Sequence, residues 1–81
     1  MNESEILARL SAIMQEVLDN PDVTLTPATT ADDVDGWDSM SNITFVVEVE
    51  RSFNVKFNTA EVEEMRNVGD MVSLISGKRA P

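Results

Sequence analysis

The sequence predicts an all-α fold: a small four-helix bundle of three longer helices and one short helix, with a long loop between the first two helices. Three observations lead to this prediction. Apolar residues recur at three- and four-residue spacings in four segments, a helix-capping residue precedes each segment, and no second alternating run is present to pair as a strand. The 81 residues are expected to form a single domain, with an ordered core over about 3–77 and a tail at 78–81.

The first expected helix covers residues 3–18, with Asn2 and Ser4 as candidate N-caps. Pro21 and the polar pair before it end this helix, because proline cannot continue a helix. One apolar stripe, which we assign to the core, runs along it: Ile6, Leu7, Leu10, Ile13, Met14, Val17 and Leu18.

A long connection over residues 19–37 shows no clear periodicity. Loops of this length in small domains are often functional. Leu25, Val34 and Trp37 are expected to hold it against the core. Its four aspartates from 32 to 38 do not fit an EF-hand, because Ala31 and Asn42 would stand where carboxylate ligands are required. We therefore predict no metal site.

The second expected helix covers residues 39–53, with Asp38 as the N-cap and Ser39 as the first helical residue. The positive end of the helix dipole and the free backbone N–H groups there favour a phosphate ester on the Ser39 hydroxyl. Gly36 is expected to supply a turn conformation that other residues resist. Ser39 is therefore a candidate attachment point.

Two apolar stripes run along this second helix. Phe45, Val46, Val49 and Phe53 form one, and Met40, Ile43 and Val47 form another, centred about 140° away. Both stripes are buried if the helix lies centrally in the bundle. Alternatively, Met40, Ile43 and Val47 stay exposed as a docking patch, flanked by the carboxylates of Glu48 and Glu50.

The rest of the chain predicts two further helices. Asn58 with Glu61 fits a capping pattern for a short helix at about 59–65, and Asn67 caps a last helix at about 68–76, which Gly77 closes. Between the second and third helices, Val55 and Phe57 are expected to fold over the end of the bundle.

Composition disfavours an enzyme. The chain has no cysteine and no histidine, so it lacks a thiolate, the commonest general base and the commonest metal ligand. No base–nucleophile pair can be assembled from the remaining residues, and we predict no catalytic residue.

The formal net charge of −9 argues against nucleic acid and for partners with basic surfaces. Residues 1–50 hold eleven of the fifteen acidic residues and one base, so the negative field surrounds Ser39. No apolar run reaches the ~20 residues of a membrane span, and the N-terminus lacks the basic region of a signal peptide. We expect a cytoplasmic monomer.

The stretch Asp35-Gly36-Trp37-Asp38-Ser39-Met40 resembles the Asp-Ser-Leu motif of acyl carrier proteins. The length, the acidity, the long loop and the Glu48–Phe53 end of the second helix are also similar to that family, over roughly residues 3–77. The resemblance implies that a Mg²⁺-dependent phosphopantetheinyl transferase moves 4′-phosphopantetheine from coenzyme A to Ser39, with Asp38 in its recognition surface. It further implies that acyl-loading and acyl-processing enzymes dock on the second helix and supply the catalysis.

The sequence also departs from the family pattern. Met40 replaces the usual leucine, which conserves volume. Fatty-acid-synthesis carriers often have acidic residues where this chain has Ser41, Thr44 and Arg51, so we predict a specialised free-standing carrier for a fatty-acid- or polyketide-like pathway. Two alternatives stay open: a peptidyl or aminoacyl carrier, which usually has Gly-Gly before the His-Ser or Asp-Ser pair, and an acidic helical interaction module without a prosthetic group.

Overall fold

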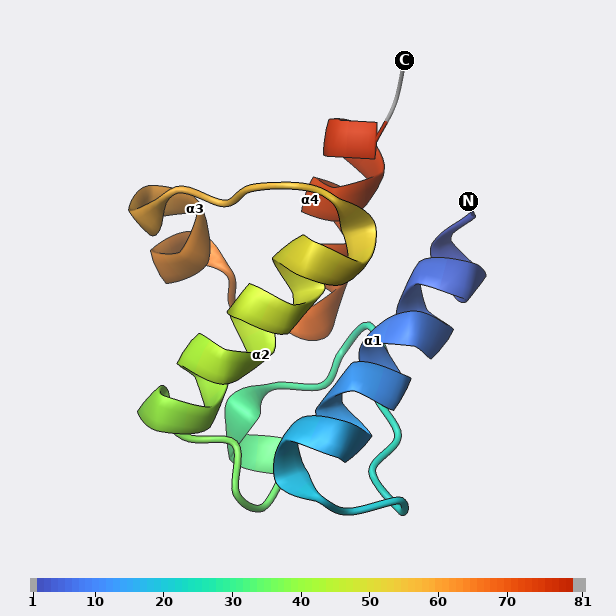
Figure 1. The fold of residues 1–81 in the computed structure, drawn as a ribbon, viewed down its shortest axis with the longest axis vertical. Coiled ribbons are helices and arrows are strands. Elements are labelled where there is room, and N and C mark those ends of the chain that lie inside the picture. Colours follow the sequence, from blue (N-terminus) through green and yellow to red (C-terminus); the bar gives the residue numbers. More distant parts are fainter. Residues whose placement is uncertain (1, 80–81) are drawn as a thin grey trace.

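The computed structural model describes residues 2–79, with the side chain of Arg79 excepted. Over this range the chain forms four α-helices and one 3₁₀ turn (Figure 1). In chain order these elements are α1 (Glu3–Leu18), η1 (Ala31–Asp33), α2 (Ser39–Phe53), α3 (Thr59–Glu64) and α4 (Val68–Arg79). No strand occurs in the described range, so the predicted all-α fold is confirmed.

The predicted limits of α1 are confirmed, and local chemistry explains both ends. At its start, the Asn2 side chain accepts the backbone N–H of Glu5 (2.8 Å), and the Glu5 carboxylate accepts the N–H of Asn2 (3.1 Å). At its end, Asp19 adopts a left-handed conformation with φ of 50°, which stops the helix.

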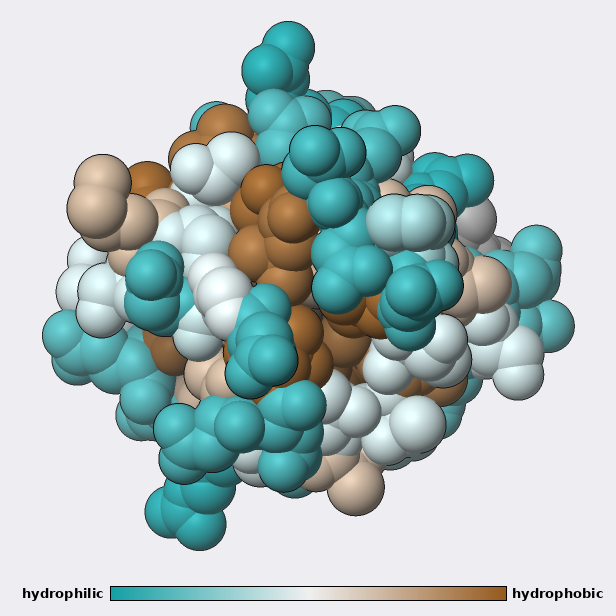
Figure 2. All heavy atoms as spheres, turned by 90° about the horizontal axis from the view of Figure 1, so that it is seen from below, coloured by the Kyte–Doolittle hydropathy of each residue, from teal (hydrophilic) through white to brown (hydrophobic). Residues whose placement is uncertain are grey.

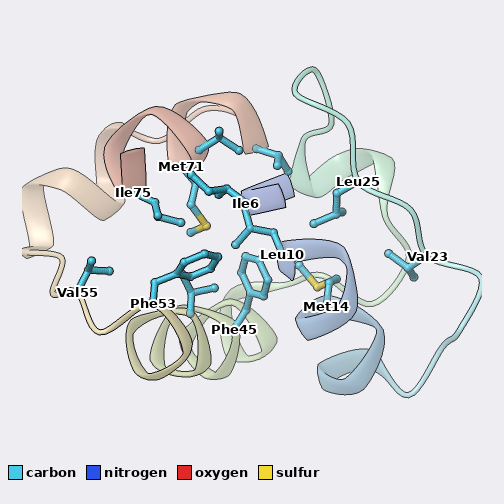
Figure 3. Close-up of a cluster of buried hydrophobic side chains, with 13 residues drawn as sticks. Ile6, Leu10, Met14, Val23, Leu25, Phe45, Phe53, Val55, Met71 and Ile75 are labelled. Atoms are coloured by element: carbon cyan, nitrogen blue, oxygen red, sulfur yellow. The ribbon is translucent and has the colours of Figure 1, made fainter. Parts of the chain in front are cut away.

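The hydrophobic core lies where α1 packs against both α2 and α4. Figure 3 shows side chains from these three helices pointing toward one another, with Leu25 and Val23 of the first loop closing one side. The fully buried members are Ile6, Leu10, Met14, Phe45, Val49, Phe53 and Ile75. The core stripe predicted for α2 is therefore confirmed, except that Val46 is only half-buried.

The long loop between α1 and α2 lies at one end of the molecule, away from the connection between α2 and α3 (Figure 1). Leu25 is buried, and Val34 and Trp37 pack against the core, as predicted. Polar side chains of α1 add two hydrogen bonds to the loop backbone. Gln15 Nε2 donates to the carbonyl of Val23 (2.8 Å), and the Ser11 hydroxyl accepts the N–H of Leu25 (3.0 Å).

The same loop also reaches the start of α4. The N–H of Val68 donates to the carbonyl of Thr29 (2.9 Å), and that of Gly69 donates to the carbonyl of Pro27 (2.8 Å). These two bonds satisfy donors that the first turn of a helix leaves unpaired. The loop therefore sets the position of α4, which lies more than thirty residues further along the chain.

Three details correct the sequence analysis. The loop contains the 3₁₀ turn η1, which was not predicted, and α3 ends at Glu64 instead of 65. More importantly, α4 does not close at Gly77 but continues to Arg79. Gly77 is not in the left-handed conformation that ends helices, and the Lys78 ammonium lies 3.0 Å from the Glu61 carboxylate and over the Phe57 ring. These contacts hold the last turn, and of the expected tail only Ala80 and Pro81 lie outside the described residues.

Candidate functional site

Asp38 caps the N-terminus of α2. Its Oδ1 accepts the backbone N–H groups of Met40 (3.1 Å) and Ser41 (3.0 Å), while its own carbonyl accepts the N–H of Asn42 (2.9 Å). Asp38 is thus the helix cap that the sequence predicted. However, its carboxylate already occupies N–H groups that we had expected to be free for a phosphate.

Ser39 is exposed at the first position of α2. In residues 2–79, no hydrogen bond engages its hydroxyl. The hydroxyl is therefore accessible to a modifying enzyme, and the positive end of the helix dipole lies beside it. A phosphate on this oxygen would stand outward from the helix end, favoured by the dipole more than by direct backbone donors.

Gly36 and Ser41 shape the turn before the helix. Gly36 has φ of 89°, a left-handed conformation that an L side chain resists, so the predicted role of this glycine is consistent with its geometry. The Ser41 hydroxyl donates to the Gly36 carbonyl (2.7 Å) and accepts the N–H of Asp38 (2.8 Å). Ser41 therefore completes a capping box in the place that glutamate usually takes.

The pKa of Asp38 is lowered from its usual range, first by the hydrogen bond from the Ser41 backbone N–H and then by the Ser41 hydroxyl. The hydroxyl has a single hydrogen, and its contact with the Gly36 carbonyl (2.7 Å) is shorter than its contact with Asp38 Oδ1 (3.2 Å). Backbone donors therefore contribute most of the effect. Asp38 stays ionised at neutral pH and adds negative charge beside Ser39.

Trp37 connects the turn to the core. Its ring meets that of Phe45 edge-on, with centroids 5.5 Å apart, and its Nε1 donates to the Asn42 side-chain oxygen (3.0 Å). One side chain thus packs on the buried face of α2 and bonds to its first turn. This double contact fixes the turn that precedes Ser39.

The second apolar stripe of α2 lies in solvent. Met40 is 80% exposed, Ile43 66% and Val47 44%, although all three are large apolar residues. Of the two readings that the sequence left open, exposure of this stripe is the observed one. We keep the name docking patch for these three residues, whose role as a binding surface stays a prediction.

The two glutamates that we expected to flank the docking patch are both engaged within the chain. Glu48 forms an ion pair with Arg51 one turn further along (3.6 Å). Glu50 accepts the backbone N–H of Phe57 (2.8 Å) and so holds the loop after α2. A partner that uses either carboxylate must therefore compete with these internal bonds.

A pocket of about 340 Å³ opens directly beside Ser39, between the start of α2, the turn η1 and the following helices. We call it the attachment pocket. Its apolar wall consists of Ala31, Trp37, Val62, Met65, Val68 and Met71. Its polar lining comprises Asp38, Ser39, Asn42, Arg66 and Asn67. Sequence reasoning missed Arg66 and Asn67 as site residues, because nothing in the chain's spacing brings them next to residue 39. It also missed Asn42, although helical spacing places this residue one turn after Ser39.

Figure 2 shows the face at the loop end of the molecule, where apolar atoms reach the surface in the middle of the face and hydrophilic atoms surround them. In the described part of the chain, no group of three or more acidic side chains is placed to hold a metal ion. The described helices include none that is long and apolar enough to cross a membrane.

Known proteins share this sequence and this fold. Residues 8–75 match the family described as a phosphopantetheine attachment site. The acyl carrier protein of Kineococcus radiotolerans is 40% identical over 76 residues, with 93% of each chain covered. That of Micrococcus luteus is 40% identical over 81 residues, with 98% of each chain covered. The solution structure of the holo acyl carrier protein from Geobacter metallireducens has a TM-score of 0.84 at 36% identity, covering 90% of this chain and 84% of that one.

A four-helix bundle of this shape, matched over most of its length by the attachment-site family, defines a protein that carries a covalent prosthetic group. The prosthetic group of such proteins is 4′-phosphopantetheine, whose thiol bears the cargo. The relatives narrow the class further: the chain belongs to the acyl carrier protein family. An exposed serine at a capped helix start, with no internal bond to its hydroxyl, fits the attachment of this group.

Proposed function

We propose that Ser39 is the attachment residue, and that the chain presents acyl thioesters to partner enzymes without catalysing a reaction itself. The observation that carries this proposal is the free, exposed hydroxyl of Ser39 at the capped start of α2, next to an exposed apolar patch. On attachment, the bond from Ser39 Oγ to phosphorus forms as the phosphoanhydride bond of coenzyme A breaks, and adenosine 3′,5′-bisphosphate leaves. The serine proton leaves to a base of the transferase.

The roles of the neighbouring residues follow from their contacts. Asp38 caps the helix start and supplies negative charge that attracts a basic transferase surface. Gly36 shapes the turn that leads into it. The prosthetic group supplies the thiol that this cysteine-free chain lacks, and partner enzymes supply the catalytic groups.

Intact-protein mass spectrometry tests the attachment site. The apo protein is incubated with coenzyme A, Mg²⁺ and a broad-specificity phosphopantetheinyl transferase. We expect a mass gain of one phosphopantetheine in the wild type and none in Ser39→Ala. Ser73→Ala is the matched control, because Ser73 is another exposed helical serine, and it should load as fully as the wild type.

Two other outcomes would change the assignment. A mass gain in a folded Ser39→Ala variant would place the group on another residue. A folded wild-type protein that gains no mass would leave the docking patch as the functional feature and favour an interaction module.

We further propose that the carrier serves a dedicated acyl pathway and docks through Met40, Ile43 and Val47. Support comes from the charges beside this patch. Arg51 neutralises Glu48, and Ser41 is committed to the cap of α2. The α2 surface thus offers less negative charge to a basic partner than the net charge of the chain suggests.

Transfer by an acyltransferase of ordinary fatty acid synthesis tests this specialisation. We expect its kcat/KM for the holo protein to be about tenfold lower than for a fatty-acid-synthesis carrier, and to rise in a Thr44→Glu, Arg51→Glu variant. Ser73→Glu, which adds a negative charge on α4, is the control and should change nothing. Efficient transfer to the wild-type holo protein would contradict the dedicated role.

A further inference from the structure

The attachment pocket contains polar groups that the carrier function described above does not use. The oxygens of its two side-chain amides are engaged. The Asn42 side-chain oxygen accepts the indole N–H of Trp37 (3.0 Å), and the Asn67 side-chain oxygen accepts the backbone N–H of Asp70 (2.9 Å). These two bonds fix which end of each amide is the oxygen. Each amide therefore keeps its NH₂ group, a pure donor, for another partner.

Arg66 adds the strongest donor. It is the one cationic residue that lines the attachment pocket. Among the described residues its guanidinium has no hydrogen-bond or ion-pair partner, whereas Arg9, Arg51 and Lys78 each contact an internal group. Its backbone N–H is bound by the Asp70 carboxylate (2.9 Å), which anchors the residue at the start of α4.

Nearby negative charge does not cancel this cation through a direct contact. Glu63, Glu64 and Asp70 share a second surface hollow with Arg66, but none of them forms an ion pair with it in the described structure. On the Ser39 side, Asp38 Oδ1 is already occupied by the N–H groups of the first turn of α2. Asp38 Oδ2 accepts no hydrogen bond among the described residues, but the unused donors of the pocket, which are the Arg66 guanidinium and the two amide NH₂ groups, outnumber this acceptor.

The apolar wall limits the size of what can enter. About 340 Å³ lies at the lower end of the ~300–1,000 Å³ range of ligand pockets. Val68 and Met71 line it and are themselves buried core residues, 2% and 5% exposed. Phe45 and Val49 are fully buried and do not line the pocket. The pocket therefore suits a short apolar stem with an acceptor-rich end.

We propose that the attachment pocket binds the cargo of the prosthetic arm, and that this cargo is a short acyl group ending in a carboxylate, which Arg66 binds. A carboxylate offers only acceptors, matches the planar guanidinium in two parallel hydrogen bonds, and leaves further oxygen sites for the amide of Asn42 or Asn67. A plain fatty acyl group would make no such bonds, and the exposed Arg66 guanidinium would stay hydrated. This inference rests on the proposed attachment at Ser39.

The test compares three cargoes of equal carbon number on the holo protein: succinyl, butyryl and acetoacetyl. Each is joined to the arm through an amide in place of the thioester, so that no cargo is lost by hydrolysis, and intact mass confirms full loading. Nitrogen-15 spectra then follow the Arg66 Nε–H signal and the side-chain amides of Asn42 and Asn67. We expect the succinyl cargo to shift these signals at least fivefold more than the butyryl cargo does.

Two variants make the test specific. Arg66→Gln should reduce the succinyl-induced shifts of the Asn42 and Asn67 amides to the level of the butyryl cargo. Arg51→Gln is the matched control, because Arg51 lies on α2 outside the attachment pocket, and it should leave the succinyl shifts unchanged. Circular dichroism spectra that match the wild type show that both variants are folded.

Each result has a distinct meaning. Full loading without an Arg66 shift, or equal shifts with the butyryl cargo, overturns this inference and leaves the carrier function intact. The acetoacetyl shifts could be as large as the succinyl shifts and unaffected by Arg66→Gln. That result would show that the pocket binds a neutral carbonyl, which overturns the assignment to Arg66. No mass gain on Ser39 overturns the proposed function, and this inference falls with it.

Discussion

Different residues cap the start of α2 and offer the free hydroxyl there. Asp38 and Ser41 bond to each other and to the backbone, so the turn is fixed from both sides. Ser39 stands between them with its hydroxyl free in the described structure. A side chain that took part in the cap could not also accept a prosthetic group, so this separation lets the helix start be rigid while its first residue stays reactive.

The cap predicts a titration. Because hydrogen bonds hold the folded-state pKa of Asp38 below its unfolded value, its stabilisation is present above the unfolded pKa and is lost as pH falls through the folded pKa. We expect a carbon-13 NMR titration of the Asp38 carboxyl to give a midpoint below that of an unperturbed aspartate. Ser41→Ala keeps the backbone donors and removes only the hydroxyl, so it should raise this midpoint by the smaller part of the shift. An unchanged or lower midpoint in the variant would mean that the Ser41 hydroxyl does not stabilise the ionised cap.

Two glycines of α4 give a matched pair of predictions. A Cβ on Gly69 would lie 2.9 Å from the Pro27 carbonyl oxygen, so Gly69→Ala must push the loop away and weaken the bond between them. A Cβ on Gly77 would meet nothing within 4 Å, and alanine is the better helix former. We expect Gly69→Ala to lower the free energy of unfolding by about 1–3 kcal/mol and Gly77→Ala to raise it by about 0.5–1 kcal/mol. Urea denaturation measures both, and equal effects would contradict the close approach at Gly69.

At the scale of the element, α2 contributes to the buried core on one side and to an exposed surface on the other. Its buried side supplies Phe45, Val49 and Phe53 to the core, and its opposite side presents the docking patch. Because the helix turns about 100° per residue, side chains only a few positions apart can belong to opposite surfaces. Partner binding through the patch therefore need not disturb the core.

Ile43 gives the test of the docking patch, because it is the middle residue of the stripe and is 66% exposed. Ile43→Ser removes apolar contact area from a partner without opening a cavity. We expect transfer of phosphopantetheine, measured as kcat/KM, to fall by about fivefold to thirtyfold, with the free energy of unfolding changed by less than about 0.5 kcal/mol. Ile43→Leu keeps the apolar area and should retain activity. Equal activity of the serine variant would remove Ile43 from the docking surface.

At the scale of the whole molecule, the loop before Ser39 belongs to the core. Leu25 is only 2% exposed although it lies in a loop, and the polar contacts of Ser11 and Gln15 hold the same segment. The loop in turn accepts the first N–H groups of α4. The functional end of the molecule is thus tied to α1 and α4 as well as to α2.

We expect Leu25→Ala to lower the free energy of unfolding by about 2–5 kcal/mol, the range for truncating a buried leucine. That loss is a large part of the stability of a small domain. Thr24→Ala changes an exposed neighbour and should alter the free energy by less than about 0.5 kcal/mol. Urea denaturation followed by circular dichroism compares the two, and similar stabilities would show that the loop is not part of the cooperative core.

Sequence reasoning predicted much of the fold and part of the candidate site. It predicted the limits of α1 and α2, the caps Asp38 and Asn58, and the apolar side of α2 that faces the core, because these depend on residues within about four positions of each other. It also selected Ser39 by its position in that local pattern. It did not predict the last turn of α4, where Lys78 contacts the distant Glu61, and it also missed η1, although the capping contacts between Thr30 and Asp33 are local.

The attachment pocket shows which features depend on the sequence alone and which depend on tertiary packing. The amino-acid sequence by itself determined that α2 begins with a capped serine, that four helical segments form, and that the chain carries no catalytic thiol or imidazole. Only the tertiary structure decided that Arg66 and Asn67 line the same pocket as Ser39, that the docking patch is exposed and that Glu50 bonds to the loop after α2. The physical reason is the range of the interactions: caps and periodicity act within one or two helical turns, whereas a pocket depends on how separate helices pack.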